Sequence, residues 1–162
     1  MKTLLALTFA ALSVASTLAM ANDPKATILQ LEERLNKIGA PKTEGTVAVA
    51  DKIVPVLLYG PRRINNNFDV VDEIKKSTGA TATVFVKDGD DFVRVSTNVL
   101  TPEGKRGVGT SLAKAKAYEA VKAGKEFCGD VDVLGTAFAA CYHPIKDASG
   151  GVIGASYIGF KK

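Results

Sequence analysis

The sequence contains a single histidine, His143, and only two cysteines, Cys128 and Cys141. One imidazole excludes the usual histidine-rich metal sites and catalysis by a pair of histidines. Neither a Cys-x-x-Cys redox motif nor a Cys-x-x-Cys-His haem-attachment motif is present. A Cys-dependent enzyme using Cys141 with His143 is the remaining catalytic alternative, but residues two apart on a strand lie too far apart for an obvious hydrogen bond between their side chains. We therefore expect no enzyme activity, no cofactor and no metal.

The sequence also lacks a concentrated patch of one charge. Its formal net charge is +4, and the Lys and Arg residues are interleaved with Asp and Glu along the chain. A nucleic-acid-binding protein would be expected to gather its basic residues into a stripe or patch, often beside stacking aromatic side chains. The charge pattern therefore indicates a solvated surface and no nucleic-acid partner.

Long hydrophobic runs are missing everywhere except at the N-terminus. Lys2 precedes an apolar stretch over residues 4–18, and the small residues Ala19 and Ala21 follow it. This pattern is typical of a secretory signal peptide over residues 1–21, and an uncleaved membrane anchor is the alternative. Cleavage near Ala21 would leave residues 22–162, a length suited to one domain with a single core. We expect an exported protein, periplasmic or secreted.

A helix is predicted at the start of the mature chain. Asp23 and Pro24 form a helix-start signature, and Gly39 marks the end of the helix. Between them an apolar stripe repeats at spacings of three and four residues, and its members are Ile28, Leu31, Leu35 and Ile38. The stripe either packs on the protein's own sheet or supports a homodimer.

The next segment predicts two short strands and a second helix. Residues 42–45 are a polar link, and the strands are expected over 46–50 and 53–59, with Pro55 favouring an edge position. After a Gly/Pro/Asn-rich turn, an amphipathic helix begins near Phe68 and ends near Gly79.

The remaining segments predict five strands, and β-branched and aromatic residues are enriched in the first two. An Asp-Gly turn joins these two strands as a hairpin. A Pro/Gly-rich loop over residues 98–110 leads to a predicted helix over 111–123, with Thr110 or Ser111 as its N-cap. The pattern indicates an α+β fold with one antiparallel sheet and helices laid over it. The five strands are expected at 81–87, 91–97, 127–133, 136–146 and 152–160.

The two cysteines are expected to form a disulfide. A two-residue turn at Leu134 and Gly135 would pair Val133 with Thr136, and this register places Cys128 opposite Cys141. An oxidising compartment would then favour a structural bridge, which contributes about 3 kcal/mol in the chain-entropy model.

Several motifs between Val54 and Phe160 occur together in a known order. Collectively they resemble the extracellular Cache sensor domains, specifically the Cache-3/Cache-2 fusion type of bacterial chemoreceptors and sensor kinases. The motifs are Tyr59-Gly60 with Ile64-Asn65, Val71-Asp72-Glu73-Ile74, the segments 78–85 and 90–99, Gly104 to Thr110, Gly124-Lys125, and Tyr142 to Asp147 with Gly151 to Gly154.

The resemblance implies a PAS-like antiparallel sheet of about five strands, preceded by an N-terminal helix and covered by further helices. A small organic ligand is expected between the sheet and the covering helix and loop, in a role in signal transduction or chemotaxis. Such domains usually sit between two membrane helices and precede a cytoplasmic signalling region, whereas this chain ends at Lys162. We therefore expect it to act through a partner receptor or kinase; the alternative is a structural or interaction protein that keeps the fold without a ligand.

Two arginines are candidates for binding a ligand carboxylate. Arg94 and Arg106 flank the Pro/Gly-rich loop, and a guanidinium pairs with a carboxylate through two parallel hydrogen bonds. A carboxylate or an amino acid is therefore the expected ligand class. The structural alternative is that arginine in this position binds loop carbonyls and holds the loop closed.

Four further residues complete the candidate ligand site. Thr97 and Asn98 offer short polar side chains, although the same atoms also form turns and helix caps. Thr110 has a similar side chain but is expected to serve as a helix cap, and it is not counted in the site. Tyr118, on the covering helix, and Tyr142, on a central strand, each offer a ring and a hydroxyl to a pocket. Both tyrosines would serve equally as core residues.

Overall fold

A computed structural model describes residues 22–162. The signal segment predicted over residues 1–21 lies outside the described residues. Within the described part the chain forms three helices, α1 (Pro24–Ile38), α2 (Asp69–Thr78) and α3 (Lys116–Lys122). Its strands are β1 (Pro41–Val49), β2 (Lys52–Tyr59), β3 (Arg62–Arg63), β4 (Thr81–Asp88), β5 (Asp91–Thr97), β6 (Phe127–Val133), β7 (Thr136–Lys146) and β8 (Val152–Lys161).

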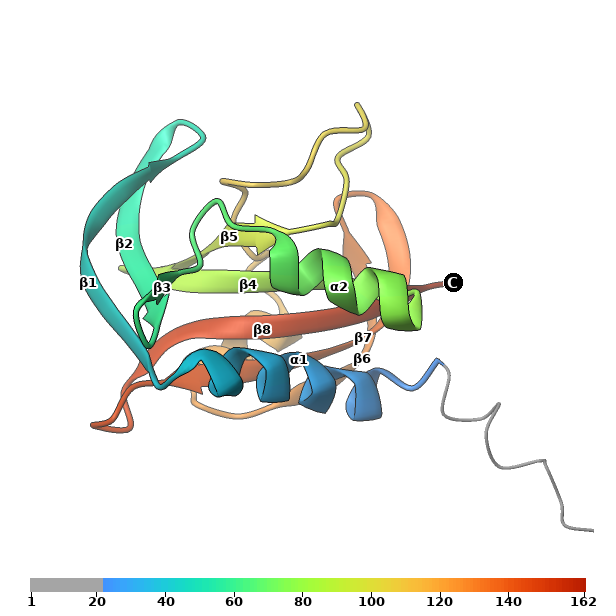
Figure 1. The fold of residues 1–162 in the computed structure, drawn as a ribbon. Helices are drawn as coiled ribbons and strands as arrows, with labels where there is room; N and C mark the ends of the chain where they lie inside the picture. The colour runs from blue at the N-terminus through green and yellow to red at the C-terminus, as the bar shows by residue number, and fades with distance from the viewer. Residues whose placement is uncertain (1–21) are drawn as a thin grey trace, which may run out of the picture.

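The strands form two antiparallel sheets (Figure 1). The larger sheet has five strands in the order β5-β4-β8-β7-β6, and the smaller has three in the order β1-β2-β3. The predicted α+β class and the five-stranded antiparallel sheet are confirmed. The expectation that all strands join one sheet is wrong, because β1 and β2 pair with each other and with β3 and stand apart as a second sheet.

Strand β1 begins earlier than the alternation of apolar residues predicts. Residues 42–45, expected to be a polar link, belong to the strand, and Pro41 pairs with Tyr59 at its first position. An edge strand can be polar because one side of its backbone and most of its side chains face water, and here pairing with the apolar β2 decides the structure. The register shifts between Thr43 and Thr46, where Gly45 has a φ of +69° and forms an irregularity of the β-bulge kind.

Pro55 lies in β2, which has strands on both sides, but β3 pairs only with Leu58 and Tyr59. Beside Pro55 the place of a strand is taken by the side chain of Asn65. Its Nδ2 donates to the Pro55 carbonyl at 3.0 Å, and its Oδ1 accepts from the Leu57 amide at 2.7 Å. The missing N–H of Pro55 is thus tolerated because no strand pairs with that side of it.

One face of the five-stranded sheet, here called the helix face, is covered by α1 and α2. Helix α1 packs on β7 and β8, and α2 packs on β4 (Figure 1). The predicted caps are present, with Asp23 accepting from the Lys25 amide and Gly79 in the left-handed region at φ +78°. The apolar stripe of α1 is buried against the sheet, since Ile28, Leu31 and Leu35 are at most 1 % exposed. The stripe therefore packs inside the chain's own core.

The opposite face, here called the roof face, is covered by α3 and by parts of residues 98–115, which we call the roof segment. Val99 and Leu112 belong to the core of the roof face, whereas Val108 packs against the core of the helix face. The predicted helix over 111–123 is wrong in its first part, because α3 begins only at Lys116. Thr110 and Ser111 instead follow the edge of β5: the Arg94 amide donates to the Thr110 carbonyl at 2.9 Å, and the Leu112 amide donates to the Phe92 carbonyl at 2.8 Å. Covering an otherwise unpaired strand edge outweighs helix propensity here. Neither Thr110 nor Ser111 caps α3, whose N-cap position is Ala115 without a side-chain bond.

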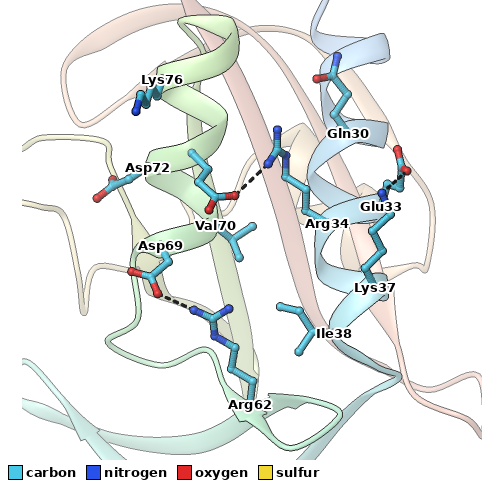
Figure 2. A pocket seen from close by; sticks show the side chains of 11 residues that line it. Gln30, Glu33, Arg34, Lys37, Ile38, Arg62, Asp69, Val70, Asp72 and Lys76 are labelled. Atoms are coloured by element: carbon cyan, nitrogen blue, oxygen red, sulfur yellow. Dashed lines mark hydrogen bonds and ion pairs between the residues drawn. The ribbon is translucent and has the colours of Figure 1, made fainter.

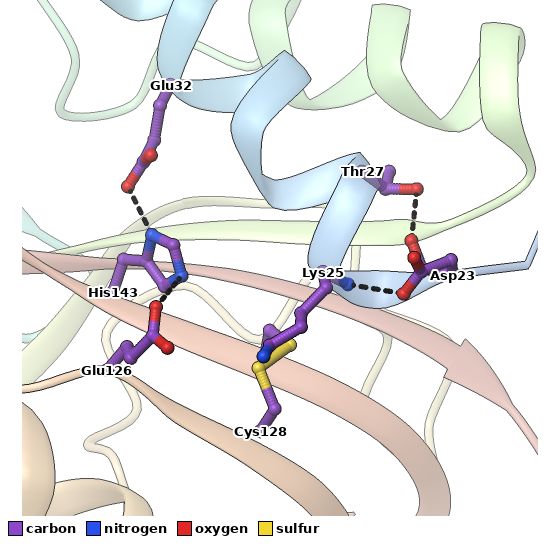
Figure 3. The surroundings of a disulfide bond; sticks show 8 residues. Asp23, Lys25, Thr27, Glu32, Glu126, Cys128 and His143 are labelled. Carbon is purple, nitrogen blue, oxygen red and sulfur yellow. Dashed lines mark hydrogen bonds and ion pairs between the residues drawn. A yellow bond between two sulfur atoms is a disulfide. The ribbon is translucent and has the colours of Figure 1, made fainter. Parts of the chain in front are cut away.

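Both predicted hairpins form, and the second has the pairing that the sequence predicts. Asp88 pairs with Asp91 around the Asp-Gly turn, and Val133 pairs with Thr136 around the Leu-Gly turn. The second register places Cys128 opposite Cys141, and the two sulfurs are bonded (Figure 3). The predicted disulfide is therefore confirmed. Because these are the only two cysteines of the chain, neither is a free thiol in this structure.

Candidate functional site

The roof face of the five-stranded sheet carries a cluster of aromatic rings. Tyr142 of β7 and Tyr157 of β8 are cross-strand partners with ring centroids 4.9 Å apart. Phe85 of β4 and Phe127 of β6 each lie with their ring centroids 6.5 Å from that of Tyr142. Alternation along neighbouring strands brings these rings to one face, where α3 and Leu112 of the roof segment cover them. The cluster therefore forms an apolar surface beneath α3 and the roof segment.

Arg94 lies within this apolar cluster. Its side chain leaves β5 on the roof face, its guanidinium carbon stands 4.9 Å from the centroid of the Phe85 ring, and the residue is 3 % exposed. Nη1 donates to the Thr110 hydroxyl at 2.9 Å and to the Ser111 carbonyl at 3.1 Å. The Nε–H is buried and has no hydrogen-bond partner in residues 22–162.

No carboxylate accompanies the Arg94 charge among the described residues, since none of their salt bridges includes it. Burial lowers the pKa of the guanidinium from its usual value, and electrostatic interaction with Tyr142 and Tyr157 opposes that change. A buried charge is costly unless an opposite charge or a full set of hydrogen bonds accompanies it. Arg94 therefore has unused capacity to bind an anion.

A cavity of about 550 Å³ opens beside this cluster, between the roof segment and strands β6 and β7. Tyr142, Phe127 and Val131 form its sheet side, and the roof side is mostly apolar. Tyr142 thus lines the cavity and also belongs to the ring cluster around Arg94. The remaining wall residues are Leu112, Ala113, Ala115, Lys116, Ala117, Asp130 and Asp132.

Burial raises the pKa of the Tyr142 hydroxyl to about 12, against the opposing effect of the Arg94 charge. The hydroxyl therefore stays protonated near neutral pH and is available as a hydrogen-bond donor at the cavity wall. Tyr118 lies on α3 as predicted, but its hydroxyl donates to the Asp90 carbonyl at 2.7 Å and its ring packs edge-on against Phe92. Tyr118 holds α3 on the β4–β5 hairpin.

Thr97 and Asn98 are buried, and other parts of the protein occupy their polar atoms. The Thr97 hydroxyl shares a hydrogen bond of 2.6 Å with that of Thr83. The Asn98 side chain accepts from the Ala82 amide at 2.8 Å and donates to the Val71 carbonyl at 2.7 Å. These contacts tie the start of the roof segment to β4 and α2, which is the local structural role that short polar side chains often have.

Arg106 is separated from Arg94 and lies toward α2. It forms a two-pronged pair with Asp72, with distances of 2.7 Å and 2.8 Å, and Nη1 also donates to the Thr97 carbonyl at 3.0 Å. The guanidinium stacks over the Phe68 ring at 4.5 Å. Asp72 raises the pKa of Arg106 further above its usual value through hydrogen bonding and charge. The two arginines that flank the loop in the sequence therefore have different environments, and only Arg94 lacks an acidic partner.

A second hollow, of about 830 Å³, lies between α1 and α2 on the helix face (Figure 2). Its walls are mainly charged, and several of the charges are paired across it or along one helix. Arg34 of α1 contacts Glu73 of α2, Arg62 contacts Asp69, and Lys37 contacts Glu33 on the same helix. Exposed ion pairs of this kind contribute little energy. Ile38 and Val70 are the apolar side chains that line the hollow, and none of its lining residues in the described part of the chain is a buried polar group without a partner.

The comparison with family models matches residues 13–162 to the Cache 3/Cache 2 fusion domain. The chain belongs to the Cache 3/Cache 2 fusion domain family. Cache domains are sensor domains, typically extracellular, that generally bind small-molecule ligands and sit in receptors or kinases. A search of curated proteins gave no match. In residues 22–162 no helix has the length and apolar character needed to span a bilayer.

The site contains residues that the sequence reasoning did not select. Phe85 stacks against the Arg94 guanidinium, Tyr157 belongs to the same aromatic cluster, and Leu112 and Phe127 line the cavity. Strand alternation was a usable signal for the first two, since Phe85 and Tyr157 occupy roof-face positions of β4 and β8. The contact of Leu112 depends on the path of the roof segment, which the helix prediction had wrong.

Proposed function

We propose that this Cache domain is an exported module that binds a small organic anion on the roof face of its sheet, with Arg94 as the anion-binding residue. One observation carries the proposal: Arg94 is a buried cation with a free Nε–H and no carboxylate partner among residues 22–162. A ligand carboxylate would supply the missing charge and the missing acceptor together. The ligand's remaining atoms would occupy the apolar cavity against Tyr142.

The roof segment is the part that must adjust for such a ligand. The hydrogen bonds of Arg94 to Thr110 and Ser111 fix the guanidinium beneath the roof segment. A carboxylate entering along Tyr142 would join these acceptors or replace them. Binding would thereby be coupled to the position of residues 109–112, which run along β5.

Export and signalling belong to the same proposal. The N-terminal pattern over residues 1–21 supports secretion, and membership of a sensor-domain family supports a role in signal transduction or chemotaxis. The chain would then present its bound or unbound state to a membrane receptor or kinase. We infer no enzyme activity, since the two cysteines are joined in a disulfide and His143 lies between two carboxylates.

The competing function is a structural or interaction protein with the same fold and no ligand. The tight packing of the ring cluster favours this alternative, because Phe85, Tyr142 and Tyr157 are each at most 2 % exposed. Under this alternative Arg94 serves only to hold the roof segment in place.

The experiment that tests the proposal is a thermal-shift and calorimetric screen of organic acids and amino acids on three proteins. These are the wild type, Arg94→Met, and the matched control Arg106→Met. A ligand that binds only the native state raises stability by about 2.7 kcal/mol at one hundred times its Kd. We expect a dose-dependent rise in Tm for the wild type and for Arg106→Met, and none for Arg94→Met.

The Arg94→Met protein should keep a Tm close to that of the wild type without ligand, because an apolar side chain of similar length replaces an unpaired buried charge. A panel without any shift, or an equal shift in Arg94→Met, would favour the ligand-free alternative.

A further inference from the structure

His143 connects three parts of the fold on the helix face. It lies on β7, and its ring lies between α1 and the segment that joins α3 to β6 (Figure 3). Nδ1 stands 2.9 Å from Oε1 of Glu32 on α1, and Nε2 stands 3.2 Å from Oε2 of Glu126 just before β6. The His143 side chain is 14 % exposed, so water has little access to its two ring nitrogens.

This arrangement suits the doubly protonated ring. An ionised carboxylate only accepts hydrogen bonds, and a neutral imidazole has only one N–H to donate. The imidazolium has two: Nδ1–H donates to Glu32, and Nε2–H carries the charge that faces Glu126 as an ion pair, without the geometry of a hydrogen bond within residues 22–162. The hydrogen bond that His143 donates to Glu32 raises the pKa of the histidine, and the charges of Glu32 and Glu126 add to this rise, while burial and the charge of Lys25 oppose it.

The other groups around the ring do not supply an alternative partner for the proton. From α1, Lys25 and Asp23 line the small cavity beside His143, together with Glu126. From β8, the Ser156 hydroxyl reaches Glu32 Oε1 only at 3.5 Å. From β2, Tyr59 stays protonated, because burial and the charge of Glu32 raise the pKa of its hydroxyl.

We propose that His143 is a proton-operated clasp that holds α1 and the α3–β6 segment on the same strand. When the ring loses a proton, the one remaining N–H stays with Glu32, whose side chain is 29 % exposed, and leaves Glu126, which is 59 % exposed. The α3–β6 segment then loses its attachment. Phe127, the next residue, lines the roof-side cavity, so the clasp transmits the pH of the surrounding solution to that wall.

The direction in which pH changes the stability of the fold follows from the difference between the His143 pKa in the folded and unfolded protein. Because the folded-state pKa is raised, the folded protein binds this proton more tightly than the unfolded chain. The stabilisation is fully present below the unfolded value of 6.5 and is lost as the pH rises through the higher folded-state pKa. This pH dependence needs no ligand and is independent of the function proposed above.

The test is a proton NMR titration of His143 in the ligand-free protein without an affinity tag, where the single histidine makes the assignment unambiguous. Glu32→Gln should lower the histidine pKa most and Glu126→Gln should lower it less, since the Glu32 contact is shorter and less exposed. Glu33→Gln is the matched control, because Glu33 pairs with Lys37 and does not contact the ring. It should leave the titration unchanged.

A second measurement follows the segment itself. The Lys125 amide donates to the Ala120 carbonyl at 2.9 Å at the end of α3. Its hydrogen-exchange protection, corrected for the intrinsic effect of pH, should fall in the wild type as His143 deprotonates. In Glu126→Gln the same protection should be low and independent of pH. Three results would each overturn the clasp: a histidine pKa at or below 6.5, equal pKa values in all variants, or a hydrogen-exchange protection of the Lys125 amide that does not change as His143 titrates.

Discussion

A guanidinium needs partners for its charge and its donors, and Arg94 and Arg106 meet that need differently. Arg106 has Asp72 in a two-pronged pair at the surface, whereas Arg94 has only neutral acceptors beneath the roof. Arginine is favoured for paired and stacked sites because its planar donors fit carboxylates and aromatic faces. Residue type therefore does not separate a ligand-binding arginine from a structural one. Burial and the absence of an acidic partner among residues 22–162 distinguish Arg94 from Arg106 and are the reason for proposing Arg94 as the ligand-binding one.

At the residue scale, Gly154 provides a sharp test of the strand spacing. A Cβ at this position of β8 would lie 2.2 Å from the carbonyl oxygen of Phe85 on the neighbouring strand β4. Backbone atoms cannot move aside cheaply, so we expect Gly154→Ala to destabilise the protein by about 1–3 kcal/mol, measured by urea unfolding.

The control for that substitution is Gly151→Ala. Its added Cβ would meet the nearest atoms at 3.5 Å, which is ordinary contact. Its unfolding free energy should stay close to that of the wild type. Equal stability of Gly154→Ala and Gly151→Ala would show that the spacing of β4 and β8 near Phe85 is looser than described.

The sequence indicates the position of some candidate site residues but not which polar groups of those residues are already occupied. Tyr142 was identified because it lies in an apolar strand, and the structure places it at the cavity wall. Thr97 and Asn98 were chosen for their chemistry, yet chemistry alone does not reveal that Thr83 and Val71 occupy their polar atoms. Such partners come from distant segments, and no local pattern encodes them. The ligand role of all six candidate residues remains a prediction.

At the element scale, the β6–β7 hairpin and its disulfide give a second prediction. The bridge joins an edge strand to an interior strand and closes a loop with a sequence separation of 13. In the chain-entropy model its removal costs about 3 kcal/mol. Cys128→Ser combined with Cys141→Ala should lower the unfolding free energy by about that amount, measured by urea denaturation.

Reduction of the wild type supplies the control for the disulfide. The reduced wild type should match the stability of the double variant, and the double variant should not respond to the reductant. A wild type whose stability is the same with and without reductant would contradict a stabilising bridge.

Elements with strong local sequence signals were predictable, whereas segments whose structure depends on pairing with a strand far along the chain were not. Helix α1 has a cap, a proline and an apolar stripe that agree, and its bounds match the prediction. Residues 42–45 and 111–115 lack such agreement. The first segment pairs with β2, and Ser111 and Leu112 of the second run along β5. Pairing partners far along the chain decide both structures, so tertiary hydrogen bonding overrides local propensity.

At the scale of the whole molecule, the five-stranded sheet separates two different environments. The helix face carries α1, α2 and the His143 clasp, while the roof face carries the aromatic cluster, the cavity and Arg94. Strand β7 belongs to both, since Tyr142 and His143 are neighbours that point to opposite faces. A ligand bound at the proposed site on one face and a proton on His143 on the other would therefore act on the same strand.

The most direct test of the account is the NMR signal of the Arg94 Nε–H during titration with a ligand found in the organic-anion screen. This hydrogen has no acceptor within residues 22–162, so a bound carboxylate would give it one. We predict that the signal moves strongly downfield as the ligand saturates the protein, together with signals of Tyr142 and Leu112. Binding that leaves the Arg94 Nε–H unchanged and perturbs the hollow between α1 and α2 instead would contradict the account.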